Sequence, residues 1–117
     1  MPNARINGMF RAFSDPTRVR ILHLLLDGEK CVGDIAGVLR MPQPKVSRHL
    51  AYLRKAGLVE SQRDGLWIHY SLTGARSGFH KKLVACLESC FDEVPEIRAD
   101  QARVKRLKKS GGCCPKP

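Results

Sequence analysis

Residues 42–72 read PQPKVSRHLAYLRKAGLVESQRDGLWIHYSL, and the two halves of this segment have different periodicities. In the first half, Val46, Leu50 and Leu53 lie four and three residues apart, which predicts a helix that begins near residue 44. In the second half, residues 60–63 and 66–72 flank an Asp-Gly pair, which predicts two strands joined by a tight turn at residues 64–65. The segment therefore predicts a helix followed directly by a β-hairpin.

The residues before this segment predict further helices. Asp15 and Pro16 are suited to cap and open a helix that extends to residue 26. Apolar residues at helical spacing predict two shorter helices, at 5–13 and at 32–39. The prolines in residues 41–44 push the residues before them out of the helical region, so this stretch is a turn.

Two short helices joined by a tight turn and followed by a hairpin describe a winged helix-turn-helix, a mainly α fold with a small β-hairpin. The second helix packs through its apolar stripe and presents polar side chains to DNA. Within the hairpin, strand 66–72 alternates, with Leu66, Ile68 and Tyr70 on one face. The candidate DNA-binding residues are Gln43, Lys45, Ser47, Arg48, His49 and Tyr52 on the helix, and Arg63 and Trp67 near the hairpin tip.

The charge of the chain supports a nucleic-acid partner. Its 117 residues include 21 Lys and Arg but only 11 Asp and Glu, which gives a formal net charge of +10. In one small domain such an excess indicates a polyanionic partner, here double-stranded DNA. No apolar run approaches the length of a membrane span and no leader precedes the first helix, so we expect a cytoplasmic protein without a membrane partner.

The chain resembles the ArsR (ArsR/SmtB) family of winged-helix metalloregulators. The resemblance lies in residues 10–22, 43–50, 53–59 and 63–72, which belong to a region covering most of residues 8–92. The combination of Ser-Arg-His-Leu with Ala-Gly-Leu-Val is specific. The resemblance implies a homodimeric repressor that binds a pseudo-palindromic operator and is released by a metal or metalloid.

The C-terminal third predicts a long apolar helix and a basic tail. Residues 77–91 form the apolar helix, which Pro95 ends, and its apolar stripe is wider than so small a domain needs, which favours a homodimer. A basic helix at 97–109 and a Ser-Gly-Gly linker follow. We therefore expect a DNA-binding and dimerisation domain at 1–95 and a basic tail with a vicinal cysteine pair at 96–117.

The five cysteines are an odd set, typical of metal binding or redox sensing in a reducing compartment. Arsenic-type members of the family carry Cys-Val-Cys where this chain reads Cys31-Val32-Gly33, so one ligand of that site is missing. Cys31 is therefore interpreted as a small buried or capping residue. His80 and Glu88 do not have the spacing of the zinc-type site of the family.

The other thiols are better candidate ligands. Cys86 and Cys90 share a helix face, and Cys113 and Cys114 follow the Gly-Gly linker. Thiolates without nitrogen or oxygen companions suit a soft, thiophilic centre. By the resemblance, the chain is a sensor of trivalent arsenic (inorganic or organic) or antimony, bound by Cys113 and Cys114 with Cys86 or Cys90, and it needs no organic cofactor.

Other interpretations stay open. Cys86 and Cys90 are also explained as small hydrophobes on an apolar stripe. A disulfide or persulfide bridge would make the chain a redox-responsive repressor of the same fold. The basic helix either contacts phosphate or is simply solvated. An enzyme is not expected, because the chain has no Gly-rich cofactor loop, no Cys-x-x-Cys and no histidine beside the paired C-terminal thiols.

Overall fold

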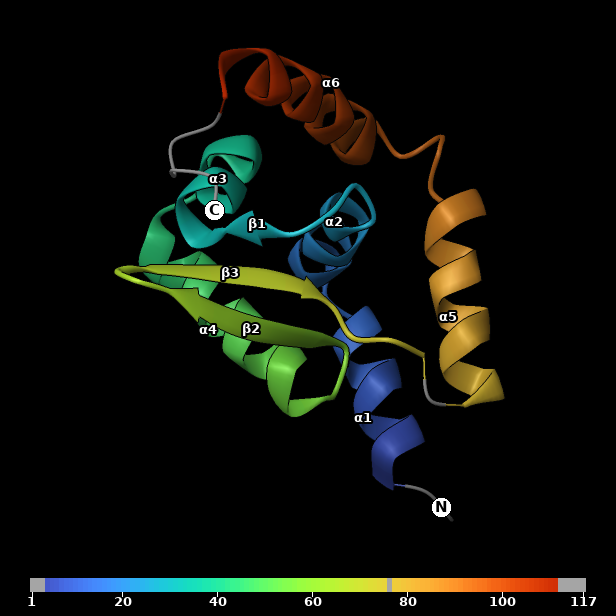
Figure 1. The fold of residues 1–117 in the computed structure, drawn as a ribbon. Coiled ribbons are helices and arrows are strands. Elements are labelled where there is room, and N and C mark those ends of the chain that lie inside the picture. Colours follow the sequence, from blue (N-terminus) through green and yellow to red (C-terminus); the bar gives the residue numbers. More distant parts are fainter. Residues whose placement is uncertain (1–3, 76, 112–117) are drawn as a thin grey trace.

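The computed structural model describes residues 4–75 and 77–111, which form six helices and three strands in the described part of the chain (Figure 1). The elements are α1 (Ala4–Phe13), α2 (Pro16–Leu25), β1 (Lys30–Cys31), α3 (Val32–Leu39), α4 (Gln43–Lys55), β2 (Val59–Asp64), β3 (Trp67–Leu72), α5 (Gly78–Ser89) and α6 (Pro95–Ser110). The predicted winged helix-turn-helix is confirmed, with α3 and α4 as its two helices and β2 and β3 as its wing.

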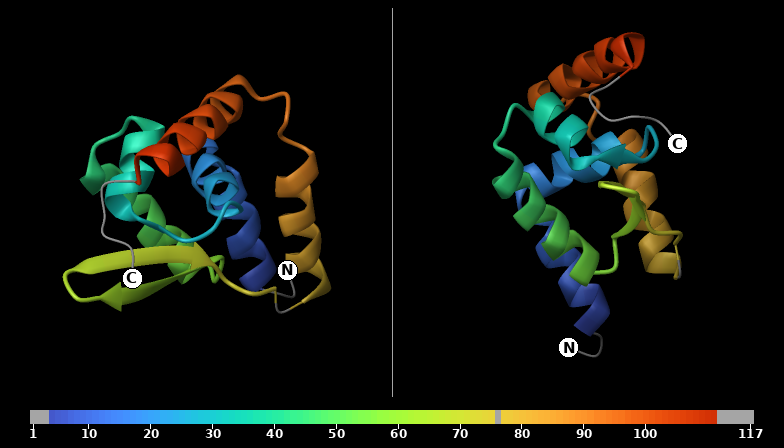
Figure 2. Two further views of the ribbon diagram at one scale, coloured as in Figure 1. Left: turned by 45° about the horizontal axis from the view of Figure 1, so that its top comes forward. Right: turned by 60° about the vertical axis from the view of Figure 1, so that its left-hand side comes forward.

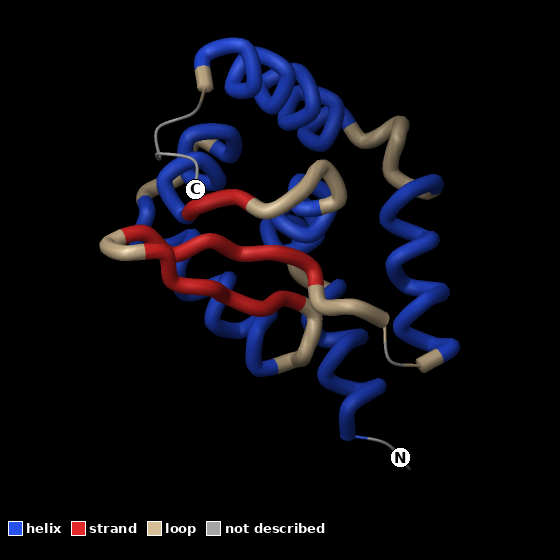
Figure 3. Tube along the Cα trace, in the orientation of Figure 1, coloured by secondary structure: helices blue, strands red, loops and turns tan. Residues whose placement is uncertain are grey.

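The sheet contains a strand that the sequence did not predict. Its order is β1-β3-β2 with antiparallel pairing, and Cys31 of β1 lies opposite His69 of β3 (Figure 3). Because β1 has only two residues, it is too short to show the alternation by which strands are recognised. Because β1 directly precedes α3 and pairs with β3, it connects the start of α3 to the wing.

The hairpin turn lies one residue later than predicted. Asp64 pairs with Trp67, so the two loop residues are Gly65 and Leu66 rather than Asp64 and Gly65. Gly65 has φ 62°, a left-handed conformation that glycine adopts without steric cost. As a loop residue, Leu66 is 95% exposed and does not share the inward face of Tyr70, which corrects the predicted alternation at this end.

The core lies among α2, α3 and α4. Its fully buried side chains include Ile21 and Leu22 of α2, Ile35 of α3 and Leu50 of α4. Helices α1 and α5 lie side by side at one edge, and α6 crosses the other side of α2 and α3 (Figures 1 and 2). Within the described residues, no helix is long and apolar enough to cross a membrane.

The last helix begins two residues earlier than predicted, because Pro95 occupies its first turn instead of ending the helix before it. Proline is favoured at this position, where its missing N–H group would have no helical partner. On the inner face of α6, Ile97 and Val104 are buried with the carboxylate of Asp100. This helix is therefore packed against the winged helix along its length.

Candidate nucleic-acid interface

Helix α4 separates a buried apolar face from an exposed polar one. The side chains of Val46, Leu50 and Leu53 are 0% exposed, as the helical spacing predicted. The polar side chains on the opposite face are exposed; they are Gln43, Lys45, Ser47 and Arg48. Because hydrophobic burial holds the inner face, the exposed side chains of Gln43, Lys45, Ser47 and Arg48 are available to a partner.

The N-terminus of α4 suits an anionic partner. The N-cap residue Pro42 has no side-chain hydrogen bond to the helix, and no acidic residue lies in the first turn. The first amide groups of a helix carry a partial positive charge and are attracted to phosphate. Lys45 adds a full positive charge at the same end. The start of α4 is therefore electropositive and exposed.

Arg18 of α2, which the sequence did not single out, contacts both α4 and the end of α1. Its guanidinium lies 4.0 Å from the centre of the Tyr52 ring and donates to the carbonyl oxygens of Ala12 (3.1 Å) and Arg11 (2.8 Å) at the end of α1. Tyr52 is 39% exposed and stacks with Arg18, so it joins α4 to α2 as well as facing outward. The signal in the sequence was the position of Arg18 three residues after the cap Asp15.

Asp15 caps α2 as predicted. Its Oδ1 accepts hydrogen bonds from the backbone N–H groups of Thr17 (2.8 Å) and Arg18 (3.2 Å). Burial raises the pKa of Asp15, but these hydrogen bonds and the nearby His49 and Arg18 outweigh it, so the pKa lies below its ordinary value. The carboxylate is therefore ionised at neutral pH.

His49 is half-buried beside this cap. Burial lowers its pKa; Asp15 opposes that effect, and the cations Arg18, Lys45 and Arg48 add to it. The imidazole is therefore neutral at neutral pH and offers both a donor and an acceptor nitrogen. A neutral histidine suits a base edge better than a phosphate.

The wing is joined to α4 by a polar contact. Arg54 Nη1 donates to Ser61 Oγ of β2 at 3.2 Å. At the far end of the hairpin, Arg63 and Trp67 are both exposed, with Trp67 at 40%. Figure 1 shows this end projecting beyond the helices, on the same side of the molecule as α4. The structure thus places the predicted wing residues at an accessible tip, and their contact with DNA stays a prediction.

The two described candidate thiols lie at the end of α5. Cys86 is half-buried and Cys90 is exposed, and neither is in a disulfide. A hydrogen bond between their side chains is the largest cause that raises the pKa of Cys86, followed by burial. The two sulfur atoms are thus neighbours, as the spacing predicted. Cys113 and Cys114 lie outside the described residues.

Cys31 has a structural role at the start of α3. Cys31 is the N-cap of α3, where its buried Sγ accepts a hydrogen bond from the Asp34 N–H at 3.4 Å, in agreement with a capping role. In residues 4–75 and 77–111, no three His, Cys, Asp or Glu side chains are grouped as metal ligands would be. The described residues therefore supply a pair of thiols rather than a complete metal site.

The family model described as "Bacterial regulatory protein, arsR family" matches residues 15–61, which include α2, α3 and α4. The arsenical resistance operon repressor of Escherichia coli is 46% identical over 86 residues, covering 73% of this chain and 74% of the relative. The transcriptional repressor SdpR of Bacillus subtilis is 43% identical over 67 residues, covering 57% and 74%. Other relatives are named for mercury and cadmium resistance, so similarity alone does not assign an inducer.

Solved structures agree with the sequence relatives. HlyU from Vibrio cholerae is 30% identical with a TM-score of 0.68, covering 78% of this chain and 98% of that chain. A homodimeric winged helix-turn-helix DNA-binding domain from Mycobacterium bovis is 30% identical with a TM-score of 0.65, covering 76% and 80%. The chain belongs to the ArsR family and is a DNA-binding transcriptional repressor rather than an enzyme.

Proposed function

We propose that this repressor acts as a homodimer and leaves its operator when trivalent arsenic or antimony binds its cysteine thiolates. The observation that carries the proposal is the neighbouring pair Cys86 of α5 and Cys90, the C-cap of that helix, both reachable from solvent. Two adjacent thiols chelate a thiophilic centre far better than one. The relatives named for arsenical resistance support the same class of inducer.

In this proposal the third thiolate comes from Cys113 or Cys114, whereas the sequence alone favoured both of these with only one of Cys86 and Cys90. Cys113 and Cys114 lie beyond the described residues, a few positions after the end of α6. A site made by α5 and the C-terminal tail would couple the inducer to the helices that carry the dimer. A tenfold to hundredfold loss of operator affinity needs about 1.4 to 2.8 kcal/mol of such coupling.

The dimer is proposed to form through α1 and α5. Phe10 of α1 is 55% exposed, and its ring lies 5.0 Å from that of Phe79 of α5 in an edge-to-face arrangement. A large aromatic side chain left exposed beside a second one is typical of a surface that another subunit covers. Replacement of Phe10 by Glu would then convert the dimer to a monomer in sedimentation equilibrium, whereas Arg11→Glu, at an exposed neighbour, would not.

Release of DNA by the inducer is tested with a duplex that the wild-type protein selects from a random 40-bp library. Fluorescence anisotropy with reduced protein would follow release by arsenite, antimonyl tartrate, zinc, cadmium and lead. We expect arsenite or antimony alone to release wild type. The variants Cys86→Ser, Cys90→Ser and the double variant Cys113→Ser, Cys114→Ser would stay bound, and Lys82→Ala at an exposed position of α5 would respond like wild type.

A redox-responsive repressor is the second candidate, favoured by the interaction of Cys90 with Cys86, which raises the pKa of Cys86. Oxidation by diamide would join two thiols as a disulfide, with two electrons and two protons passing to the diamide. Release by diamide, reversed by reductant and absent with arsenite, would select this candidate. Release by neither agent would contradict both.

A further inference from the structure

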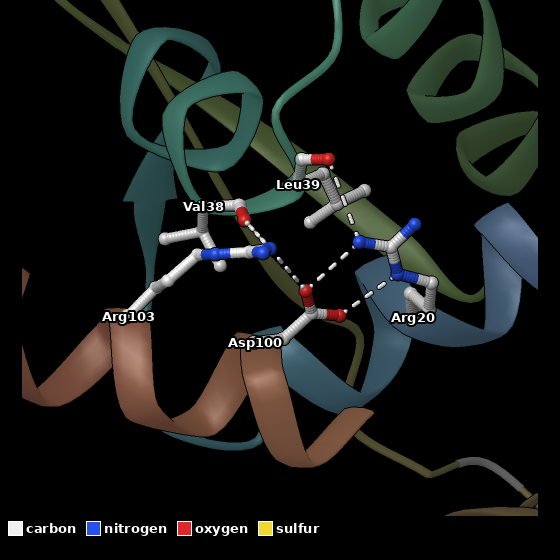
Figure 4. Close-up of polar contacts among 5 residues, drawn as sticks. All are labelled: Arg20, Val38, Leu39, Asp100 and Arg103. Carbon is white, nitrogen blue, oxygen red and sulfur yellow. Dashed lines mark hydrogen bonds and ion pairs between the residues drawn. The ribbon is translucent and has the colours of Figure 1, made fainter. Parts of the chain in front are cut away.

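A buried ion-pair cluster joins α6 to the DNA-binding helices. The carboxylate of Asp100, 3% exposed, accepts hydrogen bonds from Nε and Nη2 of Arg20 of α2, both at 2.9 Å (Figure 4). Arg103 Nη1 lies 3.4 Å from the same carboxylate. The hydrogen bond to Asp100 is the largest cause that raises the pKa of Arg20. We call Arg20, Asp100 and Arg103 the Asp100 cluster.

Both guanidinium groups of the Asp100 cluster also reach the end of α3. Arg103 Nη1 donates to the carbonyl oxygen of Val38 at 2.8 Å, and Arg20 Nη2 donates to that of Leu39 at 3.4 Å. The last carbonyls of a helix have no partner within the helix and carry a partial negative charge. Two positive donors from different helices therefore cap α3, and Figure 4 shows them on either side of Asp100.

Arg40 follows these carbonyls and lies in the turn between α3 and α4. Arg40 has φ 55°, the only left-handed non-glycine residue in the described part of the chain. The N–H of Met41 then bonds to the carbonyl of Ala36 at 3.1 Å, and α4 starts two residues later. A non-glycine residue in this conformation persists only where its surroundings hold it. The capped end of α3 supplies such surroundings.

We propose that Asp100 is a positioning residue for DNA recognition: it holds Arg20 and Arg103 on the last carbonyls of α3, and so fixes the turn that aims α4 at the operator. The inference deepens the DNA-binding function and is independent of the inducer. Asp100 itself does not contact DNA, since its carboxylate is buried. Its effect on binding passes through the two arginines and the backbone of residues 38–41.

The matched variants are Asp100→Asn and Glu96→Gln. Each removes one carboxylate from α6 and changes the net charge equally, but Glu96 is exposed and acts on Arg20 only through longer-range electrostatics, without the hydrogen bonds that Asp100 makes. Binding to the selected duplex would be measured without inducer, at a temperature where circular dichroism shows every variant folded. We expect Asp100→Asn to weaken binding at least tenfold and Glu96→Gln to stay within twofold of wild type.

Amide hydrogen exchange distinguishes two roles of Asp100: holding the turn between α3 and α4, or only holding α6 against the rest of the protein. If Asp100 positions the turn, the N–H groups of Arg40 and Met41 exchange faster in Asp100→Asn, while those of β2 and β3 keep their wild-type rates. Arg103→Lys, which keeps a positive donor near Val38, would retain binding within about threefold. Arg103→Met, which keeps neither charge nor donor, would lose as much as Asp100→Asn.

Two outcomes overturn the inference alone. One is an Asp100→Asn protein that binds the duplex within twofold of wild type. The other is faster exchange confined to α6, with residues 40 and 41 unchanged. Failure of the wild-type protein to enrich any sequence from the library would instead overturn sequence-specific DNA recognition, and the inference with it.

Discussion

Helices α4 and α6 start alike and are held differently. Each begins with a proline in its first turn, and the N-caps of both, Pro42 and Val94, make no side-chain hydrogen bond. The inner face of α4 is wholly apolar, whereas that of α6 places a carboxylate between two buried aliphatic side chains. Apolar burial is nearly indifferent to pH and salt, but an ion-pair cluster is not. Helix α4 is thus held mainly by apolar packing, which depends little on pH and salt. Helix α6 is held in part by ion pairs, which depend on both.

Removing a buried leucine from α4 should destabilise the protein most. Leu50→Ala would remove a fully buried side chain from α4 and lower the free energy of unfolding by about 3 kcal/mol, because lost transfer energy adds to the cost of the cavity. Urea unfolding followed by circular dichroism measures it. Lys55→Ala, at an exposed position of the same helix, should change stability by less than about 0.5 kcal/mol. A Leu50→Ala loss below 1 kcal/mol would contradict the packing described.

Asp100→Asn removes the carboxylate that pairs α6 with Arg20. We expect a loss of about 2 kcal/mol in the free energy of unfolding, less than for a fully unpaired buried charge because asparagine keeps one acceptor oxygen for the two arginines. The loss should be larger at low salt than at 1 M salt, where free guanidinium groups are screened. Leu50→Ala serves as the control, since its loss should not follow salt. Equal salt dependence of the two variants would argue against the distinction.

A smaller effect comes from His23, which lines the cleft between α2 and α6 together with Asp100. Burial lowers the pKa of His23 from its ordinary 6.5, and the carboxylates of Asp92 and Asp100 only partly oppose this. The unfolded chain therefore binds a proton at His23 more readily than the folded chain, so stability is full above pH 6.5 and falls as the pH falls below it.

The pH dependence is checked by comparing the unfolding of wild type and His23→Gln at pH 7.5 and pH 5.5. The variant should lose less stability than wild type between the two values. His49→Gln is a useful comparison on α4, because the pKa of His49 is also lowered by burial. An identical pH dependence in wild type and His23→Gln would contradict this assignment.

The ion pair of Lys108 near the C-terminus of α6 should contribute least to stability. Lys108 Nζ lies 2.7 Å from Asp27 Oδ1, but the lysine side chain is 60% exposed. Lys108→Gln should therefore change the free energy of unfolding by less than about 0.5 kcal/mol, because solvent screens an exposed pair. Thermal unfolding at matched salt measures this. A change as large as that of Asp100→Asn would show that the two ends of α6 are held in the same way.

The parts of the molecule that were predictable from sequence are those fixed by neighbouring residues. The spacing of Val46, Leu50 and Leu53, the cap Asp15 and the glycine at 65 each specify local geometry, so α2, α4 and the hairpin were found. The turn was placed one residue too early because strand pairing, not the turn dipeptide, decided which residues form the loop. The two-residue strand β1 exists only through its pairing with β3.

In the candidate site, too, some features follow from neighbouring residues and others only from contacts between distant segments. The outer face of α4 and the proximity of Cys86 to Cys90 follow from helical spacing alone. The stacking of Arg18 on Tyr52 and the approach of Asp100 to Arg20 join segments far apart in the chain. Nothing in the local sequence of residue 100 distinguishes a buried carboxylate from an exposed one, so only the structure could assign it.

The separation of Arg20 from Asp100 by 80 residues also has a consequence for the order in which the protein forms. During synthesis Arg20 leaves the ribosome before residue 100, so its guanidinium has no carboxylate partner from α6 at that stage. The Asp100 cluster can form only after α6 has been made and released. The end of α3 therefore gains the hydrogen bond from Arg103 only at that point.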